Sequence, residues 1–111
     1  MIKVTVYKDS AGAYLGFGCI GHAGFADRGK DVVCAGVSML VINCLNSIEK
    51  FSSTRFESVR DEKTGLWKVR FTDMPDEKAE LLMDSMVLGI KGVESNYGAD
   101  FVRFKEVVKG G

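Results

Sequence analysis

The chain has 111 residues, enough for one domain, and its 46% hydrophobic and 27% charged residues are typical of a globular protein. This composition, with 13 glycines but one proline, excludes a disordered or collagen-like segment. The 15 basic residues balance the 15 acidic ones, so no net charge attracts nucleic acid or an anionic membrane, and direct nucleic-acid binding is not expected.

The first predicted elements form a hairpin. Apolar residues at positions 2, 4 and 6 alternate with polar residues, which is the period of a half-buried strand. The sequence DSAG at 9–12 has turn chemistry, and 14–20 is predicted to be the second strand. Residues 21–30 contain three glycines and are expected to form a loop, called here the glycine loop.

Two helices and three more strands are predicted after the glycine loop. Apolar spacings of three and four predict a helix over 32–51, and a second hairpin follows at 55–60 and 66–71. Asp73 and Pro75 predict the start of a second helix, and 101–108 is the final strand. The simplest packing of this ββαββαβ order is a two-layer α/β domain of the α+β type. It has two helices on one face of a five-stranded mixed sheet and occupies residues 1–111.

Targeting segments and disulfides are not expected. The first residues alternate in polarity and lack the apolar core of a signal peptide. The most apolar stretch, 37–45, is interrupted by polar residues and is not expected to span a membrane. Three cysteines are an odd number for a disulfide framework. We therefore expect a reducing compartment and a cytoplasmic location.

Gly16, Gly18 and Gly21 match the pattern GxGxxG, but a dinucleotide site is rejected. That site needs a helix that opens at the glycines, whereas here a predicted strand carries the first two. Small residues in a strand more often mark a place where two backbones, or a bound peptide, approach closely.

Cys34 and His22 are the candidate catalytic pair. Asp31 is a suitable N-cap for the predicted helix, which would place Cys34 in its first turn, where the helix dipole favours a thiolate. His22 is the one histidine of the chain, and the glycine loop could fold it back towards the sulfur. A cysteine with a neighbouring histidine is the minimum activated nucleophile.

The residues alone leave other interpretations open for the cysteines. A free cysteine often serves as a small core residue, and Cys19 and Cys44 fit that role. Cys34 and Cys44 would lie ~15 Å apart on one helix, so a shared metal site is not expected. A redox protein is disfavoured because the chain has no C-x-x-C motif. No cofactor is expected.

Ser38 and Asp31 are candidate supporting residues. Ser38 follows Cys34 by one helical turn and could bond near the thiolate or a bound peptide, or simply back to a helix carbonyl. Asp31 could orient His22, although capping alone explains it. Gly36 inside a helix costs ~1 kcal/mol against alanine, which indicates close packing there.

The sequence GHA at 21–23, followed by GKDVVCAGVS at 29–38, resembles the signature of the ribosomal-processing cysteine proteases called Prp. That signature is GHA, a short glycine-containing loop, and then G-x-D-[IV]-V-C-A-x-[VI]-S. The chain also resembles this family in its length and order of elements.

The resemblance implies a homodimer and a catalytic dyad of His22 and Cys34. Asp31 and Ser38 match the other polar positions of the motif, and Gly21 and Ala23 flank the histidine. The implied activity is removal of a short N-terminal extension from bacterial large-subunit ribosomal protein twenty-seven. In this mechanism a Cys34 thiolate attacks the scissile carbonyl, with N–H groups at the helix start as oxyanion donors.

The competing hypothesis is a non-catalytic, ribosome-associated module that binds peptide or RNA through the glycine loop. In either case an extended peptide is expected along an exposed edge strand near 16–21. Leu81 and Val87 on the second helix are candidates for the dimer face, and they fit a core position equally well.

Overall fold

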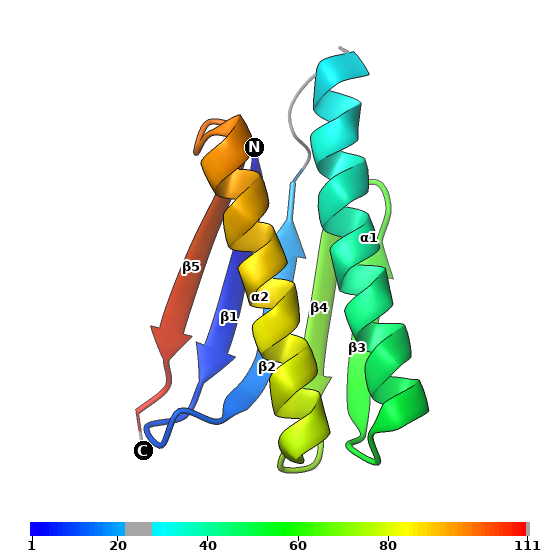
Figure 1. The fold of residues 1–111 in the computed structure, drawn as a ribbon, viewed down its shortest axis with the longest axis vertical. Helices are drawn as coiled ribbons and strands as arrows, with labels where there is room; N and C mark the ends of the chain where they lie inside the picture. Colours follow the sequence, from blue (N-terminus) through cyan, green and yellow to red (C-terminus); the bar gives the residue numbers. More distant parts are fainter. Residues whose placement is uncertain (22–27, 111) are drawn as a thin grey trace.

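The computed structural model describes residues 1–21 and 28–110, and of residues 28–31 the backbone alone. The predicted order ββαββαβ is confirmed, and Figure 1 shows both helices on the same side of the sheet. The elements are β1 (Ile2–Lys8), β2 (Tyr14–Ile20), α1 (Arg28–Phe51), β3 (Phe56–Asp61), β4 (Leu66–Phe71), α2 (Glu77–Tyr97) and β5 (Val102–Val108).

The five strands form one mixed sheet in the order β3-β4-β2-β1-β5. Neighbouring strands are antiparallel except β1 and β5, which pair in parallel from Ile2 with Val102 to Lys8 with Val108. The parallel pair requires a crossover, which α2 supplies. The last strand therefore lies beside the first, while β2 lies inside the sheet.

The core lies between the sheet and the two helices. Alternation in β1 directs Ile2, Val4 and Val6 towards the helices, and all three are almost fully buried. The predicted apolar stripes of both helices face them. Burying one such side chain stabilises the fold by roughly 1.5–3 kcal/mol. The buried helix residues are Val33, Val37, Val41, Cys44, Leu45 and Ile48 on α1 and Ala79, Met83, Met86 and Ile90 on α2.

One segment of α1, Val32–Phe51, is long and apolar enough to cross a membrane by length and composition. This differs from the expectation drawn from its polar interruptions. Such a helix is weak evidence for a membrane span, because the core helix of a globular protein has the same properties. Here the apolar stripe of α1 packs against the sheet and α2.

The N-cap of α2 lies three residues after Asp73, where the sequence predicted the helix to start. Asp76 is the N-cap, and its carboxylate accepts hydrogen bonds from the Ala79 N–H and the Ser52 hydroxyl, both at 2.8 Å. The backbone N–H of Asp76 in turn donates to the Thr54 hydroxyl at 3.0 Å. This network fixes α2 to the segment that follows α1, which explains why the helix starts here.

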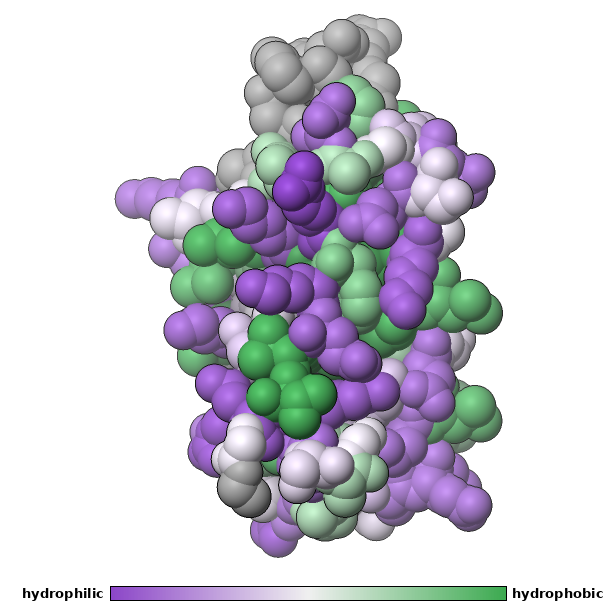
Figure 2. Space-filling model, turned by 90° about the vertical axis from the view of Figure 1, so that its left-hand side faces the viewer, coloured by the Kyte–Doolittle hydropathy of each residue, from purple (hydrophilic) through white to green (hydrophobic). Residues whose placement is uncertain are grey.

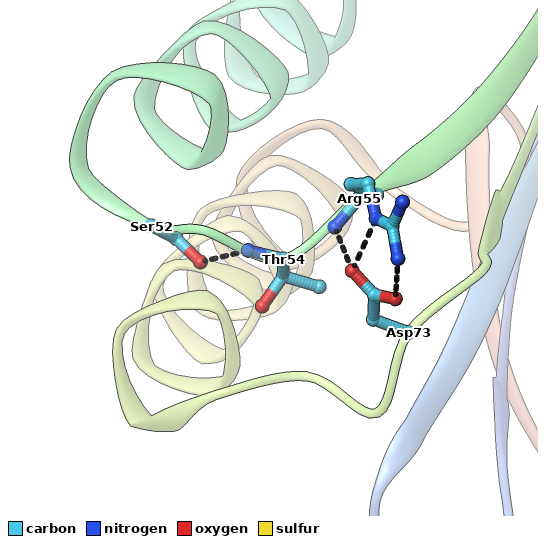
Figure 3. Close-up of polar contacts among 4 residues, drawn as sticks. All are labelled: Ser52, Thr54, Arg55 and Asp73. Carbon is cyan, nitrogen blue, oxygen red and sulfur yellow. Dashed lines mark hydrogen bonds and ion pairs between the residues drawn. The ribbon is translucent and has the colours of Figure 1, made fainter.

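Asp73, the predicted helix start, instead binds Arg55. The Asp73 carboxylate accepts three hydrogen bonds from Arg55, two from the guanidinium and one from the backbone N–H (Figure 3). These bonds hold the pKa of Asp73 below its usual value. The connection between α1 and β3 is thereby joined to the connection between β4 and α2.

We expect the Asp76 network to make stability depend on pH. Hydrogen bonds from Ala79 and Ser52 lower the pKa of Asp76 from 3.8 to about 2. Its folded pKa is below its unfolded pKa, so its contribution is complete above pH 3.8 and is lost as the pH falls through about 2. Asp76→Asn should lower the thermal midpoint at neutral pH and flatten its acid dependence. Asp100→Asn, on an exposed turn, is the matched control, and the same acid profile for both variants would contradict the assignment.

Candidate active site

Cys34 lies deeper in α1 than the sequence indicated. The helix begins at Arg28, so Asp31 lies inside it and Cys34 is its seventh residue. The N-cap prediction for Asp31 was wrong, because one cap contributes about 1 kcal/mol whereas each added helical residue gains a backbone hydrogen bond. An N–H at the depth of Cys34 donates to the carbonyl four residues earlier. The backbone N–H of Cys34 is therefore not an oxyanion donor. The dipole effect falls off within the first turn, so it does not reach the thiol directly.

A cavity of about 230 Å³ lies between α1 and the adjacent ends of β2 and β4. Cys34 and Ser38 line it from α1, and Gly21 lines it from the end of β2. The side chain of Cys34 is half-buried and packs against the core. The structure thus brings three of the predicted site residues to one space.

The other predicted site residues cannot be placed in this way. His22 and Ala23 lie outside the described residues. Asp31 is described by its backbone in α1, not by its side chain. The position of Gly21 in the cavity wall is therefore the nearest described point to His22 along the chain.

The β3–β4 hairpin supplies a wall that the sequence pattern did not reveal. Trp67 and Arg60 line the cavity, and the Arg60 guanidinium carbon lies 4.3 Å from the centroid of the Trp67 ring. The two residues are cross-strand partners, so this stacking follows from the hairpin register. The register of the predicted hairpin was enough to pair Arg60 with Trp67. Their position beside Cys34 depends on the order of the strands in the sheet, which the sequence did not give.

The sheet opens beside the cavity. Pairing between β2 and β4 ends at Cys19 with Trp67, although β1 still pairs with Ile20 and β3 still pairs with Leu66. Gly21, which follows β2, and Leu66, the first residue of β4, line the cavity where this pairing ends. The expected edge strand at 16–21 is wrong as stated, because β2 is an inner strand, but its end borders this opening.

Gly16 and Gly21 confirm the interpretation that backbones pass closely, whereas Gly18 has no such contact. A Cβ on Gly16 would lie 2.2 Å from the Val69 carbonyl oxygen, and one on Gly21 would lie 2.3 Å from the Met1 carbonyl oxygen. Gly21 also has a φ of +97°, which favours glycine. Close backbone packing thus explains two of the three glycines of the dinucleotide pattern.

Cys19 and Cys44 are core residues, as expected. Burial, and to a lesser extent the neighbouring Cys34, raise the pKa of Cys19 to about 11. Burial raises the pKa of Cys44 to about 12, and its thiol lies 3.6 Å from the Leu82 carbonyl oxygen. Both remain thiols at neutral pH and are poor nucleophiles. Among the described residues, no group of three or more His, Cys, Asp or Glu is placed to hold a metal ion.

A half-buried thiol that lines a cavity is suited to acyl transfer. Comparison with known proteins also indicates a cysteine enzyme that acts on peptides. Residues 1–102 match the family model for the cysteine protease Prp. The ribosomal processing cysteine protease Prp of Bacillus subtilis is 32% identical over 103 residues, which cover 87% of this chain and 90% of that protein. The protein of the same name from Staphylococcus aureus is 28% identical over 97 residues, covering 87% and 92%.

Solved structures share the fold over nearly the whole chain. Prp from S. aureus with a covalently linked product peptide superposes with a TM-score of 0.87 at 26% identity, covering 96% of this chain and 99% of that one. SMU.848 from Streptococcus mutans gives a TM-score of 0.88 at 31% identity, covering 98% and 96%. Together with the matched family model, these likenesses identify the chain as an enzyme, a cysteine protease that belongs to the Prp family.

Proposed function

We propose that this enzyme removes the N-terminal extension of the precursor of large-subunit ribosomal protein twenty-seven, with Cys34 as nucleophile and His22 as base. The observation that carries the proposal is that Cys34, Ser38 and Gly21 line one cavity at the point where β2 and β4 separate. The relatives named ribosomal processing proteases, and the S. aureus structure with a substrate peptide, support a peptide substrate of this origin. We place the reaction in the cytoplasm, where thiols remain reduced.

The proposed reaction is acyl transfer. His22 takes the proton of Cys34, the thiolate attacks the scissile carbonyl, and the protonated histidine gives that proton to the leaving amine. Water then hydrolyses the thioester and frees the enzyme. In this proposal Ser38 and Asp31, together with Gly21 and Ala23 on either side of the histidine in the sequence, are supporting or substrate-binding residues.

The opening between β2 and β4 suits an extended peptide. Backbone groups at the end of a strand can pair with such a peptide, as in strand addition, while its side chains enter the adjacent cavity. The half-buried Trp67 ring offers an apolar surface there, and Arg60 and Glu62 add charges of both signs. The alternative of a non-catalytic ribosome-associated module is not favoured, because the family is one of cysteine proteases.

The direct test is cleavage of purified ribosomal protein twenty-seven that carries its extension, followed by intact mass. We expect one defined product from the native enzyme. Cys34→Ser and His22→Ala should each reduce the rate by at least about a thousandfold, because the two residues act as one unit. Cys44→Ala, which removes a buried thiol outside the cavity, is the matched control and should remain active. Full activity of His22→Ala would exclude the dyad.

Alkylation tests the identity of the nucleophile separately from the substrate. With iodoacetamide at neutral pH we expect a single adduct on Cys34, because the raised pKa values of Cys19 and Cys44 keep them protonated. Labelling of those two should appear only after denaturation or as the pH approaches about 11. Peptide mapping by mass spectrometry measures each site. Labelling of Cys44 in the folded protein as fast as Cys34 would contradict this selectivity.

We infer a homodimer formed through α2. Leu81 and Leu88 are 68% and 74% exposed and lie seven residues apart, so they share one face of the helix. Val87, the other expected dimer residue, instead packs against the core.

Sedimentation velocity tests this dimer. Leu81→Gln with Leu88→Gln should shift the native enzyme towards monomer, because the pair removes exposed apolar surface from α2. Val59→Gln, at a similarly exposed valine on the opposite face of the sheet, should leave the dimer intact. Identical behaviour of both variants would remove α2 as the interface.

A further inference from the structure

Among the described residues, no helix lies over one face of the sheet. Both helices cover the same side, and in Figure 1 they lie in front of the sheet. Strand register places residues of the other side in rows, such as Val59, Lys68, Gly18, Thr5 and Lys105. We call this uncovered side the basic face, because most of its charged residues are lysine or arginine.

The basic face concentrates positive charge that the neutral composition conceals. Six of the 15 basic residues of the chain lie on it, all exposed, but only two of the 15 acidic residues, Glu57 and Asp61. The face therefore carries four excess positive charges, and the rest of the chain four excess negative charges. The six basic residues are Lys3, Lys68, Arg70, Arg103, Lys105 and Lys109.

Most of these cations have no acidic partner on the face. Within the described residues, the one ion pair there joins Arg70 to Glu57 at 2.9 Å, and both side chains are more than 60% exposed. A pair so exposed contributes little and is easily exchanged for another anion. Figure 2 views the molecule from the β5 edge, where hydrophilic residues surround a hydrophobic patch.

A shallow hollow of about 480 Å³ lies in the basic face. Its floor includes Gly18, above which no atom lies within 4 Å of the position that a Cβ would take. Tyr7 borders the hollow, and Lys109 lies 5.0 Å from the centroid of its ring. An exposed cation–π contact is weak, so Lys109 is readily displaced from the ring.

We propose that the basic face binds single-stranded RNA, with its lysines and arginines at phosphates and Tyr7 stacked on a base in the hollow. A sheet surface that combines an accessible aromatic ring with surrounding cations is a recurrent way to bind single strands. The hollow over the glycine gives a flat base access to the sheet. An acidic peptide would pair with the lysines and arginines, but its carboxylates would not stack on the Tyr7 ring or fill the hollow.

This surface is separate from the catalytic cavity, and the proposal does not depend on Cys34. Cys34 projects from α1 on the covered side of the sheet, whereas Lys68 and Tyr7 point to the opposite side. Loss of RNA binding and loss of proteolysis are therefore distinguishable by separate variants.

The test is fluorescence anisotropy with a labelled oligouridylate of about twelve nucleotides, titrated at several salt concentrations. We expect binding that weakens with salt. The double variant Lys68→Gln, Lys105→Gln should lower the slope of log affinity against log salt by ~1.4, or ~0.7 for each lost phosphate contact. The matched control Lys50→Gln, Lys78→Gln removes two exposed cations from the helices and should leave the slope unchanged.

Tyr7→Leu distinguishes RNA from other anions. It should weaken oligouridylate binding by roughly five- to a hundredfold and leave the salt slope unchanged, since stacking is not ionic. A labelled polyglutamate of equal charge should bind more weakly than the RNA and be insensitive to Tyr7→Leu. Equal affinity for both probes, equal losses in the two double variants, or no RNA binding at low salt would each overturn the proposal. Thermal midpoints of all variants establish that they are folded.

Discussion

One-sided burial of the sheet is the constraint on which the rest of the structure depends. Strand side chains alternate between faces, and β1, β2 and β4 direct their buried apolar residues to the same side. Two helices with matching apolar stripes are then sufficient to close the core. A one-residue slip of β1 would exchange Val4 for Lys3 or Thr5 and disrupt that core. The same register gathers the polar residues on the opposite side, so core and basic face arise from one pattern.

The cavity beside Cys34 depends on where this sheet stops being continuous. α1 spans the sheet, and Cys34 lies near its beginning, over the point where β2 and β4 separate. At the other end of α1, Asp76 binds Ser52 and caps α2. The anchored end therefore fixes the helix, and the cavity lies towards its other end.

Burial distinguishes the three cysteines chemically. Cys19 and Cys44 face the apolar layer, where desolvation disfavours a thiolate and raises both pKa values. Cys34 is half-buried and borders the cavity. Two structural thiols and one accessible thiol thus coexist in the same small domain without disulfide formation.

The sequence by itself determined the order of elements, their approximate bounds, the core stripes and the signature around Cys34, because each depends on local periodicity or a contiguous motif. It did not determine which aspartate caps a helix, because a cap contributes only about 1 kcal/mol and tertiary partners decide between candidates. Asp73 binds Arg55, and Asp76 is the N-cap of α2. Only the tertiary structure decided the strand order, the placing of Trp67 beside Cys34, and the separation of charge in a neutral chain. These features depend on contacts between residues far apart in the sequence, which local patterns do not encode.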